Sequence, residues 1–179
     1  MDLSRLQQQL QQPNLAPVEH WNPSFCGDLP IFIDSEANWH YQGSIISRPA
    51  LVKLFASVLL KQGADYFLQT PAEKVRIQVA DAAFMVTDYH WQATAQGPAL
   101  LLTTNIEQTV LVSPQYPLLL KASPQQQLLP YLQLWRGLSA KLSRTMYYQL
   151  AEQAKPVFCN GKQHYQLKSA GYPFTFAII

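Results

Sequence analysis

The sequence predicts an α+β fold of two related β-rich lobes, each a β-sheet or partial barrel with one helix. Short segments rich in apolar and β-branched residues follow one another along most of the 179 residues, separated by turn residues. Two internal segments instead have helical spacing and helix-end signals. With 48% hydrophobic and 13% charged residues, the chain has enough apolar material for a core. We therefore expect an ordered protein.

The N-terminal segment differs from the rest of the chain. Leucines at helical spacing among glutamines predict a short amphipathic helix over residues 2–12, ended by Pro13. Several prolines then favour an extended arm. We assign residues 1–22 to this helix and arm.

The first lobe is expected over residues 23–87. Two strands joined by a polar turn, IFID-SEAN-WHYQGSIIS, lead into a helix with Ser47 as its N-cap and Pro49 in its first turn. Gly63 marks the position just past the end of that helix. The segments DYFLQT and VRIQV are typical of strands, and the second alternates so that one face is buried.

The second lobe is expected over residues 88–179. Strand-like segments form a meander, and a helix follows from Arg144 to Ala154, before Pro156. The last segments are typical of a hairpin with Asn160-Gly161 as its turn, followed by a closing strand.

The two helical regions resemble each other in sequence. Ile46–Leu51 aligns with Leu142–Tyr147, and Tyr41-Gln42-Gly43 upstream of the first resembles Trp135-Arg136-Gly137 upstream of the second. A diverged duplication explains this similarity. The alternative is chance, since a serine N-cap followed by apolar helical spacing is common at helix starts.

Charge and cysteine content narrow the class of protein. The formal net charge of +2 argues against general nucleic-acid binding, although the chain has six basic and nine acidic residues through Tyr89 and seven basic and two acidic after it. The basic half could attract an anion, and solvated surface charge is the alternative. Cys26 and Cys159 lie far apart, and no signal peptide or membrane-spanning segment is evident, so we expect a cytoplasmic protein that binds no membrane.

Motifs for catalysis or metal binding are absent from the sequence. It has no nucleophile elbow, dinucleotide fingerprint or zinc-protease motif, so an enzyme is not expected. An acid–base pair of Glu73 and a histidine is the enzymatic alternative. A calcium-like pattern beginning at Asp34 fails, because Trp39 and Ile45 occupy positions that require Gly and Glu. The four histidines are isolated in sequence, so no metal site is expected.

The first helix start is the principal candidate binding site. Gly43 and Ser44 precede Arg48, so backbone N–H groups, a hydroxyl and a guanidinium could converge there on one anion. Trp39 and Tyr41 share one strand face and could stack on a planar ring. The alternative is a core aromatic pair beside an ordinary turn.

Two further segments carry polar side chains at strand ends. Thr70, Glu73 and Lys74 lie in a proline-containing turn, and Thr104 and Asn105 follow another strand. These groups suit ligand binding, and closing surface turns is the alternative in both places.

The same segments together resemble the domain-of-unknown-function family 1285 of proteobacteria. The resemblance rests on WHYQGSIISRPALVKLFASVLL, DYFLQTPAEKVRIQVADAAF, LTTNIEQTV and MYYQLAEQA, and covers most of the chain after the arm. Ile45 stands where the pattern has a proline, which makes the loop after Gly43 and Ser44 less rigid. Ile106-Glu107 stands where a glycine is usual, which weakens the case for Asn105 as a ligand contact. The matching motif residues are Trp39, Tyr41, Gln42, Gly43, Ser44, Arg48, Thr70, Pro71, Glu73, Lys74, Thr104 and Asn105.

The resemblance implies a duplicated core whose second lobe is pleckstrin-homology-like. It also implies a nucleotide-like ligand between the lobes and a role in signalling, while no cofactor and no oligomeric state follow from it. We therefore expect a protein that binds a small anionic molecule. A protein-interaction adaptor without such a ligand is the alternative.

Overall fold

The computed structural model describes residues 15–179, so the helix expected over residues 2–12 lies outside the described residues. Contacts divide the described chain into two units, each considered by itself. The N-terminal unit runs to Ala83 and also contains Trp135–Leu138, and the C-terminal unit comprises Phe84–Leu134 and Ser139–Ile179. The boundary expected between residues 87 and 88 falls inside strand β7 (Phe84–Gln92).

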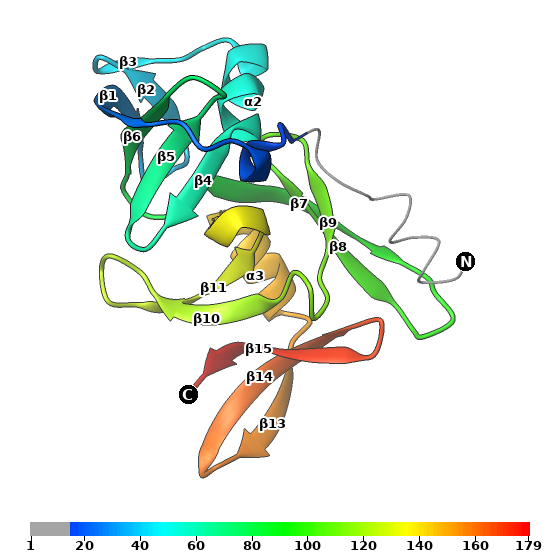
Figure 1. The fold of residues 1–179 in the computed structure, drawn as a ribbon. Coiled ribbons are helices and arrows are strands. Elements are labelled where there is room, and N and C mark those ends of the chain that lie inside the picture. Colours follow the sequence, from blue (N-terminus) through cyan, green and yellow to red (C-terminus); the bar gives the residue numbers. More distant parts are fainter. Residues whose placement is uncertain (1–14) are drawn as a thin grey trace. The chain divides into compact units, whose positions relative to one another are not determined.

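A six-stranded sheet, here called sheet A, forms the N-terminal unit (Figure 1). Its strand order is β3-β2-β1-β6-β5-β4, and every neighbouring pair is antiparallel except β1 with β6. Helix α2 (Pro49–Ser57) joins β3 to β4, and the short 3-10 helix η1 (Val18–His20) precedes the sheet. The strands are β1 (Phe25–Ile33), β2 (Trp39–Tyr41), β3 (Ser44–Ile45), β4 (Leu59–Gln62), β5 (Asp65–Gln69) and β6 (Lys74–Val79).

One face of sheet A packs against α2. Ile33 and Trp39 are paired across β1 and β2 and are both buried, and the Trp39 ring stacks on Phe55 of α2 at 6.2 Å between centroids. Ile77 of β6 is buried on the same face, as the alternation of VRIQV predicts. Sheet A therefore has an inner face toward α2 and an opposite, outer face.

The structure places both ends of the first helix at other residues than the sequence predicted. The helix begins at Pro49 with Arg48 as N-cap, in an extended conformation and with no side-chain capping bond, so Ser47 is not the cap. The residue before a proline is driven out of helical geometry, which places the boundary at Arg48. The helix ends at Ser57 rather than near Gly63, because Leu59–Gln62 pair with β5 as a strand.

The C-terminal unit contains a second six-stranded sheet, sheet B, and a three-stranded sheet, sheet C. Sheet B has the order β10-β11-β12-β7-β8-β9, and sheet C has the order β13-β14-β15. Its other elements are β8 (Ala99–Thr104), β9 (Thr109–Leu111), β10 (Leu118–Ala122), β11 (Leu128–Gln133), β12 (Ser139–Leu142), α3 (Arg144–Ala151), β13 (Lys155–Cys159), β14 (Lys162–Ser169) and β15 (Tyr172–Ile178). The 3-10 helix η2 (Trp135–Gly137), between β11 and β12, belongs to the N-terminal unit. The apolar run of β8 is buried on both faces, and the hairpin turn at Asn160-Gly161 is confirmed.

Strand order confirms the internal duplication. In each six-stranded sheet two three-stranded meanders are joined by a parallel pair of the first and last strands, β1 with β6 and β7 with β12. The helices, however, are not equivalent, because α2 links the third and fourth strands while α3 follows the sixth strand. The link between β9 and β10 contains Pro114 and Pro117 and forms no helix. The alignment of Ser47 with Ser143 is therefore wrong, although the duplication is real.

The second similarity reflects turn geometry. Gln42 and Gly43 have φ angles of 49° and 82°, and Arg136 and Gly137 have φ angles of 54° and 71°. Two successive left-handed residues ending in glycine also form the Asn160-Gly161 hairpin turn. The resemblance between these segments comes from this recurring turn rather than from equivalent positions in the duplicated sheets.

Candidate functional site

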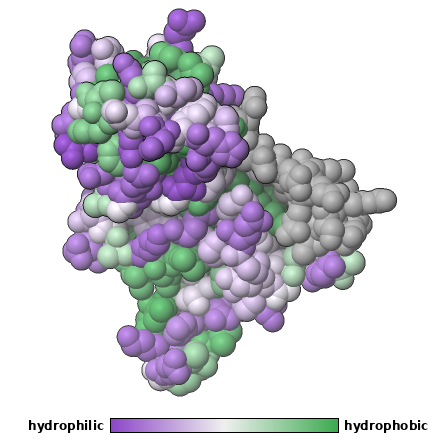
Figure 2. Space-filling view, viewed as in Figure 1, coloured by the Kyte–Doolittle hydropathy of each residue, from purple (hydrophilic) through white to green (hydrophobic). Residues whose placement is uncertain are grey.

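A groove of about 480 Å³ lies on the outer face of sheet A. This volume is within the range of about 300–1,000 Å³ typical of small-molecule sites. Hydrophilic and hydrophobic groups alternate on the visible surface of the N-terminal unit, in the upper part of Figure 2. The groove is lined by Asp28, Leu29, Phe32, Ala64, Asp65, Tyr66, Arg76, Ile77, Gln78 and Val79.

An ion pair holds the Arg76 side chain in this groove. Arg76 donates from Nε to Asp28 Oδ1 at 2.7 Å and from Nη2 to Asp28 Oδ2 at 3.1 Å, and its Nη1 lies 3.9 Å from Asp65 Oδ1. The hydrogen bond from Arg76 lowers the pKa of Asp28, and the same contact raises the pKa of Arg76. A bidentate pair of this kind fixes the plane of the guanidinium. Asp65 is left with acceptor capacity toward the groove.

Aromatic rings flank the charged groups on the outer face. Phe32 is 40% exposed and lies 6.1 Å from the His40 ring, and Phe25 meets Phe67 edge-on at 6.2 Å. Lys74 Nζ is 4.4 Å from the centroid of the Phe67 ring and also bonds to the Gln62 side chain. Lys74 and Arg76 are two residues apart on β6, so they share this face.

The outer face offers groups that can bind polar molecules. The carboxylates of Asp28 and Asp65 can accept hydrogen bonds from hydroxyl or amino groups, and Phe32 offers an exposed ring for stacking. Lys74 and Arg76 balance the charge of the two carboxylates. No cluster of three potential metal ligands occurs among the residues that the structure describes.

The structure does not bring the residues expected at the first helix start into one site. Gly43 lies at the tip of the β2–β3 hairpin with Ser44 beside it, whereas Arg48 follows the opposite end of β3. Trp39 is 2% exposed and belongs to the core, so for this ring the core alternative is correct. Tyr41 is 44% exposed near the hairpin tip.

Arg48 remains a candidate anion contact by itself. Its side chain makes no hydrogen bond or ion pair with the described part of the chain, and the first turn of α2 has no acidic residue. Pro49 lacks an amide hydrogen, and the Leu51 amide already donates to Arg48 O at 3.0 Å. This start therefore offers fewer backbone donors than the sequence pattern suggested.

At the expected site in the β5–β6 turn, one of the three residues closes the turn and the other two do not. Thr70 accepts from the Glu73 amide at 3.0 Å through its hydroxyl, and its own amide donates to Glu73 O at 2.8 Å. The turn-closing alternative therefore describes Thr70. The Glu73 side chain is exposed, and Lys74 extends over the outer face as described.

Thr104 and Asn105 lie in the C-terminal unit, where both close a turn. Thr104 is buried and its amide donates to Gln108 O at 2.9 Å, and Asn105 Oδ1 accepts from the Met85 amide at 3.0 Å. Glu107 takes the left-handed position with φ of 61°, so the turn forms without a glycine there. These contacts occupy the polar groups that suggested a ligand site.

The calcium-like segment is a turn organised by Asp34. Its Oδ1 accepts from the Glu36 and Asn38 amides at 2.8 and 2.9 Å, and its Oδ2 lies 2.9 Å from His40 Nε2. Burial raises the pKa of Asp34, but the hydrogen bonds from His40, Asn38 and Glu36 outweigh burial and lower it to about 2.

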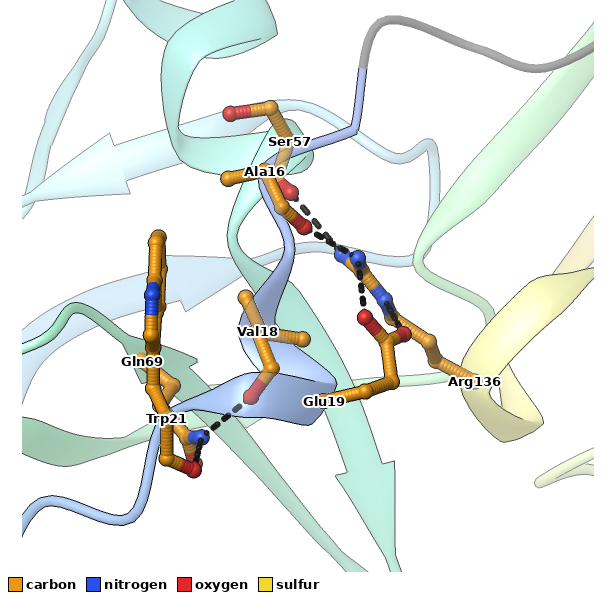
Figure 3. Close-up of polar contacts among 7 residues, drawn as sticks. All are labelled: Ala16, Val18, Glu19, Trp21, Ser57, Gln69 and Arg136. Atoms are coloured by element: carbon orange, nitrogen blue, oxygen red, sulfur yellow. Dashed lines mark hydrogen bonds and ion pairs between the residues drawn. The ribbon is translucent and has the colours of Figure 1, made fainter.

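Sequence patterns did not identify the polar network around Arg136 (Figure 3). Arg136 is nearly buried and donates from Nε to Glu19 Oε1 at 2.5 Å and from Nη1 to Ser57 O at 2.9 Å, and it also bonds to Ala16 O. Beside it, Gln69 Nε2 donates to Val18 O and to Trp21 O, each at 2.9 Å. No spacing rule links residues 117 positions apart, so only the three-dimensional structure reveals this network.

The sequence pattern predicted the orientation of only some of the groove residues. The alternation of VRIQV places Arg76 and Gln78 on the outward face of β6, as the structure confirms. Asp28 and Asp65 had no such marker, because their approach to Arg76 depends on strand pairing.

Comparison with known proteins places the chain among uncharacterised bacterial relatives. Family models described as DUF1285, a domain of unknown function, match residues 16–82 with the N-terminal domain and residues 83–176 with the C-terminal domain. No curated protein matches the chain in sequence.

Two crystal structures of relatives are similar to this chain. A DUF1285 family protein from Silicibacter pomeroyi DSS-3 is 30% identical with a TM-score of 0.81, and the match covers 98% of this chain and 95% of that chain. A DUF1285 family protein from Shewanella baltica OS155 is 31% identical with a TM-score of 0.56, and the match covers 71% of this chain and 94% of that chain.

Proposed function

The chain belongs to the DUF1285 family, and we propose that it is a non-catalytic binding protein for a nucleotide-like anionic molecule, with a role in signalling in the cytoplasm. One observation carries the proposal: the groove on the outer face of sheet A combines two carboxylates, a fixed guanidinium and an exposed ring. None of the described helices is long and apolar enough to span a bilayer.

Each part of a nucleotide has a counterpart on this face. Carboxylates accept hydrogen bonds from sugar hydroxyls, a role suited to Asp28 and Asp65. A base can stack on Phe32, whose ring is partly exposed. Lys74 on the same face supplies positive charge for a phosphate, which fits the anionic ligand expected from the sequence, while Arg76 is held by Asp28.

Arg48 is a separate candidate for the anion contact. It precedes α2, which covers the inner face of sheet A, whereas the groove lies on the outer face. Substitutions in the groove and at Arg48 therefore show which of the two positions binds the anion. The pleckstrin-homology-like character of the C-terminal unit stays a prediction.

Thermal unfolding with a panel of nucleotides tests the proposal. A ligand at about 100 times its dissociation constant adds about 2.7 kcal/mol, which raises the Tm by roughly 5 to 10 °C at this size. We expect at least one nucleotide to produce this shift in the wild type and in Arg144→Ala, a control on α3. Phe32→Ala and Asp65→Asn should abolish the shift while leaving the ligand-free Tm nearly unchanged, because both side chains are exposed.

Two outcomes contradict the groove as the site. The first is the absence of a shift with any nucleotide. The second is a shift that survives both groove substitutions and is lost with Arg48→Ala, which places the anion contact at the start of α2.

A protein-interaction adaptor is the second candidate function. It is favoured by exposed apolar side chains on sheet C, where Phe158 is 78% exposed and Val157 is 41% exposed. These two side chains are neighbours on the edge strand β13 and project from its opposite faces.

A further inference from the structure

Sheet C has one strongly basic face. β13 pairs with β14 so that Cys159 lies opposite Lys162 and Lys155 lies opposite Gln166. Alternation along β14 then places Lys162 and Lys168 on the same face as Lys155. The sequence contains no Asp or Glu after residue 152, so no acidic side chain of this sheet offsets the three lysines.

The basic face of sheet C points to solvent. The opposite face carries Leu167 and Phe174, which are paired across β14 and β15 and are both buried. Phe176 is also buried and lies 5.0 Å from the Tyr147 ring of α3. The packed side of the sheet therefore holds these apolar residues, and all three lysines are exposed.

The outer edge of β13 has unpaired backbone groups. β13 is an edge strand that pairs only with β14 among the described elements. Gln163 exchanges amide–carbonyl bonds with Ile179, so its backbone groups point away from β13. Since bonding directions alternate along an antiparallel strand, Phe158 opposite Gln163 directs its N–H and C=O away from β14. Pro156, which needs no donor partner, has the same orientation.

Apolar side chains accompany this free edge. Phe158 is the most exposed large apolar side chain of β13, and Val157 projects from the other face of the same strand. In Figure 2 hydrophobic and hydrophilic groups lie side by side at the lower end of the view, where Figure 1 shows β13 and β14. An added strand could therefore contact apolar groups as well as backbone.

We propose that the edge of β13 docks an acidic polypeptide segment in extended conformation. The segment adds a strand to sheet C by bonding to the N–H and C=O of Phe158, and its carboxylates face Lys155, Lys162 and Lys168. This partner goes beyond the small-molecule function and uses the other unit of the chain.

Charge and geometry favour this occupant over others. A second copy of the chain would bring its own three lysines to the same edge, where like charges repel. A single-stranded nucleic acid stacks on aromatic rings next to basic groups, but Phe158 and Tyr165 lie on the face opposite the lysines. Carboxylates on an extended segment match both the charge and the free backbone edge.

Fluorescence anisotropy of a labelled ten-residue peptide of alternating Val and Glu tests the proposal in the full chain. We expect saturable binding that weakens with added salt, and no binding of the matched peptide of Val and Lys. Phe158→Pro removes the outward N–H without breaking a β13–β14 bond, so affinity should fall by about tenfold or more, since backbone bonding supplies affinity in strand addition. Replacing the three lysines by glutamate should abolish binding, whereas Arg144→Glu on α3 should not.

Controls separate loss of docking from loss of folding and from nucleic-acid binding. Circular dichroism must show that Phe158→Pro retains wild-type strand content; if it does not, Phe158→Ala, which removes only the side chain, replaces it with an expected loss of several-fold. The proposal is overturned if a ten-residue oligothymidylate binds more tightly than the peptide and ignores both Phe158 substitutions. A concentration-dependent dimer that excludes the peptide, or affinity unchanged by both substitutions, also overturns it.

Discussion

Arg136 and Glu19 form a bidentate ion pair across 117 positions of sequence, with Nε–Oε1 and Nη2–Oε2 distances of 2.5 and 3.1 Å. The Arg136 side chain is 8% exposed, whereas that of Glu19 is 58% exposed. The same guanidinium also bonds to the carbonyls of Ala16 and Ser57 (Figure 3). It therefore ties a segment from late in the sequence to the arm and to the end of α2.

Arg136→Ala should lower the free energy of unfolding by about 2 kcal/mol or more, since it removes charge-assisted bonds from a nearly buried group. Urea unfolding followed by tryptophan fluorescence measures the change. Arg144→Ala, at an exposed arginine on α3, serves as the control and should shift the midpoint little. Equal midpoints for the two variants would show that the network contributes little to stability.

The Glu19 carboxylate should make stability depend on pH. The hydrogen bond from Arg136 lowers the pKa of Glu19 in the folded protein below its ordinary value of 4.5. The stabilisation that Glu19 gives to the folded state is therefore complete at pH values above that ordinary pKa. It is lost as the pH falls through the lower pKa of the folded protein. The difference in unfolding midpoint between wild type and Glu19→Gln should narrow from pH 6 to pH 3, and a difference that stays constant would refute the assignment.

The Asp34 carboxylate should make a larger acid-dependent contribution to the free energy of unfolding than Glu19 does. Its pKa falls from 3.8 to about 2, which corresponds to roughly 2 kcal/mol that is present above pH 3.8 and lost as pH falls through the folded pKa. Asp34→Asn should therefore cost about 2 kcal/mol at pH 6 and much less at pH 2. Denaturant titrations at both pH values test this, and an equal cost at the two would contradict it.

The helix boundaries predict different effects for two serines. Ser143 caps α3 by accepting from the Met146 amide at 3.3 Å, whereas Ser47 makes no capping bond to α2. Ser143→Ala should cost about 1 kcal/mol in the free energy of unfolding, and Ser47→Ala close to none. Equal losses would indicate that Ser47 caps its helix after all.

The sequence predicted which segments form strands and turns better than it predicted which elements of the two sheets correspond to each other. Alternation in VRIQV and the Asn160-Gly161 turn are local signals, and both were confirmed. The duplication was inferred from Ser47 and Ser143, which occupy unrelated places in the two sheets. Strand order arises from long-range pairing, which a local match of helix starts does not record.

The candidate site was less predictable for the same reason. Arg76 could be placed outward from periodicity alone, but Asp28 reaches it through the parallel β1–β6 pair. Trp39 showed the opposite problem, since an aromatic residue on a strand suits a stacking platform and a core equally well until α2 is placed over it.

Amide NMR of the isotope-labelled protein, recorded with and without the nucleotide that shifts the Tm, tests the central claim most directly. Binding in the groove predicts that the largest signal changes cluster at Asp28, Phe32, Asp65, Arg76 and Gln78 on the outer face of sheet A. Changes confined to residues near Arg48, or no changes at saturating nucleotide, would contradict a ligand site in the groove.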